Sequence, residues 1–124
     1  MMFLINKKLI YKLIEPYQES NMQICYATPQ HFSAYSSKAV LLLNQDKLIV
    51  LFLNFFSSKV IHTVELSIAD MQEHHYNKGM SLASIWSFQS DGHSWRFSIL
   101  KKLIPLGKMQ QEFLDFLNEH IINT

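Results

Sequence analysis

The best-determined local structure in the sequence is a hairpin over residues 84–99, which read SIWSFQSDGHSWRFSI. Polar and apolar residues alternate on both sides of Asp91-Gly92, as they do in two β-strands that each bury one face. An Asp-Gly pair tolerates the positive φ angles of a two-residue type I′ turn, and such a turn fixes the strand register. Phe88 is therefore predicted to lie opposite Trp95, and Trp86 opposite Phe97. One face of this antiparallel hairpin then gathers four aromatic side chains, and the other face is mostly polar.

The remainder of residues 22–99 also reads as strands. Residues 39–43 and 48–54 are apolar runs joined by four polar residues, which predicts a second hairpin. The other segments are short, and alternation or β-branched residues favour strands there. The expected strands cover residues 22–28, 39–43, 48–54, 60–66, 71–76, 81–89 and the second half of the 84–99 hairpin. The sequence therefore predicts about seven antiparallel strands.

Amphipathic helices are predicted at both ends of the chain. Within the N-terminal segment 1–16, residues 2–15 place their apolar side chains on one face at 100° per residue, and Pro16 ends the helix because the residue before a proline is pushed out of the α region. Residues 106–122 repeat the helical period. The apolar face of the first helix includes Phe3, Leu9, Ile10, Leu13 and Ile14, and that of the second includes Met109, Phe113, Phe116, Leu117 and Ile121.

Composition points to a single folded domain over residues 1–124. Of these residues, 48% are hydrophobic and 17% are charged, so the chain can bury a core. A net charge of +1 argues against a nucleic-acid partner. The single cysteine, Cys25, excludes an intramolecular disulfide. The first ten residues place apolar side chains before charges, which is the reverse of a secretory signal, and a cytoplasmic location is expected.

Two stretches resemble the bacterial pleckstrin-homology-like (PH-like) domain family. Residues 39–51, AVLLLNQDKLIVL, are similar to the hairpin of that family, although Lys47 stands where members often have arginine. Residues 64–71, VELSIADM, are similar to the segment that leads into the family's fifth strand. The Asp91-Gly92 hairpin and the helix over residues 108–122 complete the resemblance. It implies a mainly β (α+β) open barrel of about seven strands, closed by the C-terminal helix, and a non-catalytic binding or scaffold role.

Catalytic, cofactor-binding and metal-binding residues are not predicted, so the protein is expected not to be an enzyme. His74 and His75 are adjacent in a strand and point to opposite faces, which favours surface histidines over ligands of one metal ion. Cys25 lies in the middle of a predicted strand and is interpreted as a buried structural thiol. The aromatic face of the last hairpin is interpreted as core, with a ligand platform as the alternative.

The expected function is binding of a protein or peptide, and the alternative is binding of a lipid or membrane surface. An exposed sheet edge can accept an extended peptide through main-chain hydrogen bonds. The strand over residues 60–66 is the candidate edge, and it includes Val60, His62 and Val64. Glu65 is its only charged residue, and so the only one that would discourage pairing with another chain. The first helix is the other candidate surface.

Three roles are open for that helix. Its apolar face, which is composed of Phe3, Leu9, Ile10, Leu13 and Ile14, could pair with a second copy in a homodimer or cover the sheet. With three lysines beside that face, the helix could instead lie on a membrane surface, which is the less favoured alternative. The homodimer is preferred.

Overall fold

The computed structural model describes residues 5–31, 34–77 and 79–123. The elements in chain order are α1 (Lys7–Ile14), β1 (Gln23–Pro29), β2 (Ala39–Leu43), β3 (Lys47–Leu53), β4 (Val60–Ser67), η1 (Ile68–Asp70), β5 (Gln72–Asn77), β6 (Ala83–Ser90), β7 (His93–Leu100), η2 (Ile104–Leu106), α2 (Met109–Phe116) and η3 (Leu117–Ile122). The elements η1 and η2 are single 3₁₀ turns, and η3 continues α2 as a π-helical turn.

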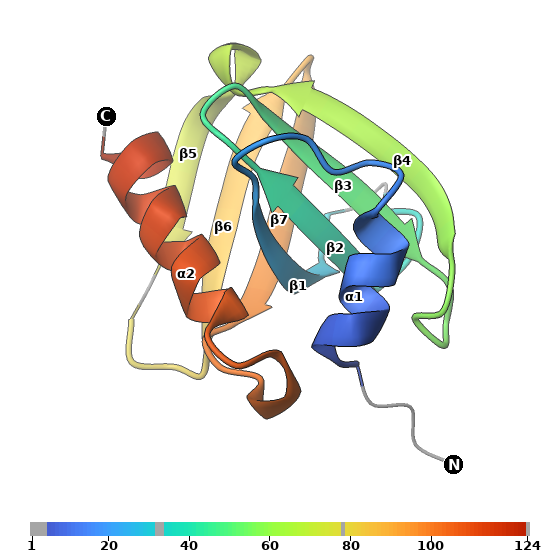
Figure 1. The fold of residues 1–124 in the computed structure, drawn as a ribbon. Coiled ribbons are helices and arrows are strands. Elements are labelled where there is room, and N and C mark those ends of the chain that lie inside the picture. The colour runs from blue at the N-terminus through green and yellow to red at the C-terminus, as the bar shows by residue number, and fades with distance from the viewer. Residues whose placement is uncertain (1–4, 32–33, 78, 124) are drawn as a thin grey trace.

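The seven strands form one antiparallel sheet in the order β4-β3-β2-β1-β7-β6-β5. Strand β1 joins the two halves of the sheet, β2–β4 and β5–β7, because Gln23–Ala27 pair with β2 whereas Thr28 and Pro29 pair with β7. The halves face each other without closing, so β4 and β5 are the two edge strands (Figure 1). The predicted fold class is confirmed: the protein is mainly β, with the architecture of a PH-like open barrel and a helix at each end of the chain.

The β6–β7 hairpin forms as the sequence predicts. Asp91 and Gly92 have φ angles of 53° and 76°, and the register places Phe88 opposite Trp95 and Trp86 opposite Phe97. Trp86, Phe88 and Phe97 are buried in the barrel interior, and Trp95 is half-buried against them. The core interpretation of this aromatic face is therefore confirmed.

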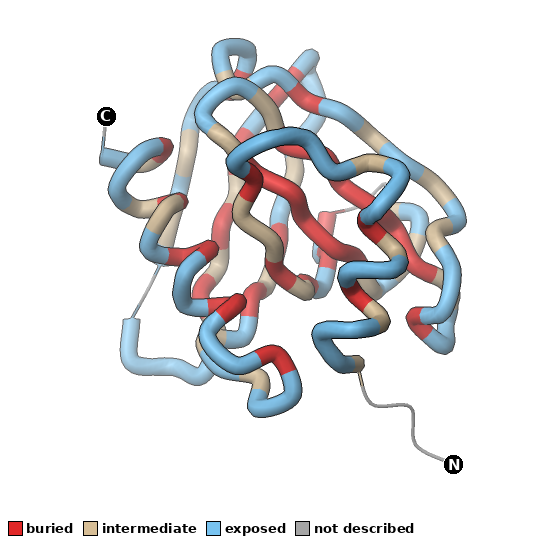
Figure 2. Tube along the Cα trace, in the orientation of Figure 1, coloured by how far each residue is buried: buried red, intermediate tan, exposed pale blue. Residues whose placement is uncertain are grey.

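Strands β2 and β3 are buried on both faces. Leu41 and Val50 belong to the barrel interior, whereas Leu42 and Leu51 belong to a second cluster on the outer side of the sheet, beneath α1. In Figure 2 the two strands form a continuous buried track. This double coverage explains why their sequences are unbroken apolar runs instead of alternating ones.

The first helix differs from its prediction at its start. The expected helix began at residue 2, but α1 begins at Lys7, because the side chain of Asn6 accepts a hydrogen bond from the Leu9 N–H (2.9 Å) and caps the helix there. The helix ends at Ile14, close to Pro16 as predicted. The predicted reason is wrong, however, because Glu15 keeps helical backbone angles (φ −47°, ψ −46°) and is not pushed out of the α region. Phe3 lies outside the described residues.

The C-terminal helix covers the barrel interior as predicted, but it begins later than residue 106. Leu106 belongs to η2, and Gly107 has a φ of 59°. This positive φ is incompatible with a right-handed helix, so the helical conformation is interrupted there and α2 begins at Met109. Phe113, Leu117 and Ile121 are buried in the barrel core. Lys108 and Glu119 are exposed.

Candidate functional site

The free edge of β4 is the first candidate site. The Ile68 N–H donates to the Asp46 carbonyl (2.9 Å), one step beyond the Lys47–Ser67 pair of the β3–β4 ladder. Antiparallel pairs alternate between hydrogen-bonded and non-hydrogen-bonded. Counting back from Ile68, every second residue of β4 is hydrogen-bonded to β3, and Thr63 and Glu65 lie between these residues. Their backbone N–H and C=O groups therefore face away from β3, toward the free side of the strand.

Alternate side chains of β4 have different environments. Those of Val60, His62 and Val64, which were selected from the sequence, are half-buried, and the two valines pack against the hydrophobic clusters. The exposed residues are Ile61, Thr63 and Glu65. The structure thus brings the three selected residues onto one edge strand but turns their side chains toward the protein. A peptide would contact the backbone and the intervening residues.

Large exposed apolar side chains flank the start of β4. They form what we call the aromatic end of the strand, composed of Tyr35, Phe55, Phe56 and Ile61. The Tyr35 ring stacks on the ring of His62, with centroids 3.7 Å apart. Lys38 Nζ lies 4.7 Å above the centre of the Phe55 ring. This feature was not predicted from the sequence, because the segments before β2 and before β4 read as turns, and their pattern does not indicate which apolar residues stay exposed.

An acidic pocket lies at the other end of β4. It has a volume of about 320 Å³ and is lined by four carboxylates and one ammonium group, those of Asp46, Glu65, Asp70, Asp91 and Lys47. Lys47 Nζ donates to Glu19 Oε2 (3.1 Å) and to Glu65 Oε2 (3.3 Å). These hydrogen bonds, first to Glu19 and then to Glu65, raise the pKa of Lys47. The lysine is therefore already engaged, and the pocket as a whole favours a cation.

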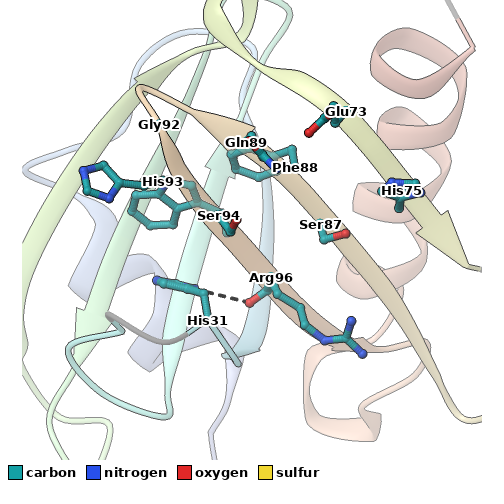
Figure 3. Close-up of a pocket in the computed structure, with 11 residues that line it drawn as sticks. His31, Glu73, His75, Ser87, Phe88, Gln89, Gly92, His93, Ser94 and Arg96 are labelled. Carbon is teal, nitrogen blue, oxygen red and sulfur yellow. Dashed lines mark hydrogen bonds between the residues drawn. The ribbon is translucent and has the colours of Figure 1, made fainter.

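A second pocket, of about 440 Å³, lies along β5, β6 and β7 (Figure 3). His31 Nδ1 lies 3.4 Å from the Arg96 carbonyl, so this nitrogen is the donor and Nε2 is the bare acceptor. Burial lowers the pKa of His31, which keeps the ring neutral. His31 Nε2 and Trp95 Nε1 are buried and have no hydrogen-bond partner among the described residues. Two rings that line the pocket, 4.5 Å apart between centroids, thus each keep a buried nitrogen without a hydrogen-bond partner among the described residues.

The other polar candidates have structural surroundings. Trp86 Nε1 donates to His74 Nδ1 (3.2 Å), so His74 is tied to the core while His75 is exposed. Cys25 is fully buried, and burial raises the pKa of its thiol well above the ordinary value. Across residues 5–31, 34–77 and 79–123, no group of three or more His, Cys, Asp or Glu side chains is arranged to hold a metal ion.

The apolar face of α1 requires a correction. Ile10 and Ile14 are fully buried against the outer side of β2 and β3, and Leu9 and Leu13 are partly buried. Of the three roles left open for this helix, covering the sheet is the one that the structure shows. Ile10 and Ile14 are therefore not available as a surface for a second copy. In the part of the chain that the structure describes, the helices are too short or too polar to cross a membrane.

Comparisons with known proteins inform the fold alone. No protein-family model matches the chain, and no curated protein matches it. Among solved structures, the hSac2 domain from human phosphoinositide phosphatase Sac2 is similar, with a TM-score of 0.53 and 12% sequence identity. The match covers 96% of this chain and 83% of that chain. It supports the open-barrel architecture, and at this identity a ligand is not carried over.

Proposed function

We propose that this protein is a non-enzymatic binding module that accepts an extended segment of a partner protein along β4. The observation that carries the proposal is the free edge itself: His62–Ser67 pair with β3 without interruption, and the outward backbone groups of Thr63 and Glu65 are placed to pair with another strand. We further propose that the chain belongs with the bacterial PH-like domains that it resembles.

The other edge of the sheet is less suited to this role. In β5, Glu73 has a φ of 54°, and the register with β6 shifts between Gln72 and His75. Only His75–Asn77 form a regular ladder there. A bulge of this kind twists an edge and prevents further strand addition. In β4 the corresponding shift lies at the start of the strand, between Phe52 and Leu53 of its partner, and leaves the remainder regular.

The two ends of β4 define the chemistry of the partner. The aromatic end favours large apolar side chains, and the acidic pocket favours a lysine or arginine. Eight residues of β4 span about 26 Å at 3.3 Å per residue. The partner segment is therefore an extended peptide of comparable length, with apolar residues at one end and a basic residue at the other.

Selection from a random peptide library on the full chain tests the proposal. Enriched peptides should carry apolar residues separated from a basic residue by a short extended spacer. In a titration with a selected peptide, the backbone amide signals of Thr63 and Glu65 should shift, whereas those of β5 should not. Failure to enrich any peptide, or amide shifts confined to elements other than β4, would contradict the proposed function.

A further inference from the structure

Two loops at one end of the barrel form an exposed surface that the peptide proposal does not use. The loop after β5 and the loop after β7 lie side by side, because the Lys101 N–H donates to the Leu82 carbonyl (2.9 Å) and Lys101 Nζ donates to the Gly79 carbonyl. Figure 1 shows both loops near the N-terminal end of α2. We call residues 79–82 and 100–108 the lysine–aliphatic surface.

The aliphatic side chains on this surface project into solvent. Met80, Leu82 and Ile104 are 104%, 84% and 83% exposed, the highest values among the exposed large hydrophobic side chains of the described chain. Leu100 is also exposed, at 42%. Scattered single hydrophobic residues on a surface are ordinary, but several on two hydrogen-bonded loops form a patch that indicates an interaction surface.

The charges around these side chains are predominantly positive. Residues 79–82 and 100–111 contain three lysines and no acidic residue. Lys102 and Lys108 are exposed and form no ion pair with any described residue. The side chain of Lys7 lies against Gly107, which adds a fourth lysine. The neighbouring carboxylates are Glu112 and Asp115, farther along α2, which line small pockets with Lys7 and Lys101.

We propose that the lysine–aliphatic surface binds the surface of an anionic membrane. Exposed aliphatic side chains enter the boundary between headgroups and acyl chains, and the lysines around them are attracted to anionic headgroups. The mixture of exposed aliphatic side chains with Lys102 and Lys108, which form no ion pair with a described residue, favours this occupant over a second protein, since the core of a protein interface is depleted in lysine. Binding of this kind needs no membrane-spanning helix, and it is independent of the β4 edge.

Sedimentation of the full chain with vesicles tests the proposal. The chain should bind vesicles of phosphatidylcholine with phosphatidylserine, and should bind phosphatidylcholine alone much more weakly. Added salt should weaken the binding, because the lysines contribute through exposed charges. Each lysine near an anionic surface contributes about 1 kcal/mol, or about fivefold in the partition coefficient, so Lys102→Gln with Lys108→Gln should reduce binding about 25-fold.

Matched variants separate the two contributions and serve as controls. Lys8→Gln with Lys12→Gln, two exposed lysines on α1, changes the net charge by the same amount and should leave vesicle binding nearly unchanged. Met80→Ser with Leu82→Ser keeps the charge and should reduce binding about tenfold or more. Circular dichroism should show that all three variants remain folded, because every altered side chain is exposed.

Two results would overturn the proposal. The first is an absence of sedimentation with phosphatidylserine vesicles, which would leave a protein partner as the occupant of this surface. The second is an equal loss of binding in the α1 control and the Lys102/Lys108 variant, which would show that vesicle binding depends on the net charge of the protein and not on this surface. The peptide selection on β4 uses a different surface and readout, so its outcome stands apart from both results.

Discussion

Gln110 on α2 holds the backbone of Tyr26 as a neighbouring strand would. The Tyr26 N–H donates to Gln110 Oε1 (2.8 Å), and Gln110 Nε2 donates to the Tyr26 carbonyl (2.9 Å). The same Nε2 also donates to the Leu100 carbonyl (2.9 Å). Strand β1 begins to pair with β7 only at Thr28, so the buried Gln110 amide satisfies backbone groups where the two halves of the sheet diverge.

Replacing this amide should destabilise the protein strongly. Gln110→Leu leaves the Tyr26 N–H and two carbonyls without partners, and each buried unsatisfied group costs about 1–3 kcal/mol. We expect the free energy of unfolding, measured in urea, to fall by about 3 kcal/mol or more. The matched control is Gln111→Leu, an exposed position, which should change it by less than about 0.5 kcal/mol. Equal effects of the two variants would show that Gln110 is not a structural link.

The aromatic core of the last hairpin gives a second prediction. Trp86 is fully buried among Phe88 and Phe97, with ring centroids 4.9 and 6.2 Å away. Trp86→Ala should lower the free energy of unfolding by about 3–5 kcal/mol, since a large buried ring is removed. Phe55→Ala, which truncates an exposed ring, is the control and should have a small effect. A melting temperature unchanged by Trp86→Ala would contradict the core interpretation and revive the ligand-platform alternative.

Two histidines should make stability depend on pH. Burial lowers the pKa values of His31 and His74 from the ordinary value of 6.5, and in His31 a hydrogen bond to Arg96 opposes the effect. The unfolded chain therefore binds protons more readily. The stability that these rings contribute is present above about pH 6.5 and is lost as the pH falls through their pKa values in the folded state.

Urea unfolding at neutral pH and at mildly acidic pH measures this dependence. His74→Gln keeps an acceptor for the Trp86 N–H but removes a titrating group, so the loss of stability on acidification should become smaller. The exposed neighbour supplies the control for the substitution itself: His75→Gln should change the free energy of unfolding at neutral pH by less than about 0.5 kcal/mol. A larger free energy of unfolding at acidic pH than at neutral pH would contradict the expected direction of this dependence.

The C-terminal helix should be required for folding. Phe113, Leu117 and Ile121 contribute buried side chains to the barrel interior, and Gln110 supplies the link to β1. A chain that ends at Pro105 would expose that interior, and we expect it to lack a cooperative unfolding transition and to bind a hydrophobic dye. A soluble, cooperatively folding fragment of this length would contradict the role of α2.

Local signals in the sequence predicted much of the fold. The two-residue Asp91-Gly92 turn fixes the register of the hairpin, so the pairing of Trp86 with Phe97 could be predicted from this segment alone. The apolar face of α1 was equally clear, but a pattern of apolar residues does not say what covers it. The sheet covers it, and Ile10 and Ile14 are buried there.

The candidate site was less predictable, because long-range packing assembles it. The strand over residues 60–66 was recognised, yet the acidic pocket beside it joins Asp46, Asp70 and Asp91, which only the folded barrel brings together. The role of Gln110 was also missed, since a polar residue in a helical pattern is read as exposed unless its partner strand is known. Phe55 and Phe56 counted toward overall hydrophobicity, and nothing in their local sequence marks them as exposed.

Peptide binding along β4 is tested best by calorimetric titration of Thr63→Pro and Thr63→Val with a peptide selected on the original chain. Proline removes the outward N–H of an edge strand without breaking the ladder to β3, whereas valine keeps that N–H. Both variants should stay folded. We expect Thr63→Pro to weaken binding about tenfold or more and Thr63→Val to leave the Kd nearly unchanged. Equal affinity for the two variants would contradict binding along the β4 edge.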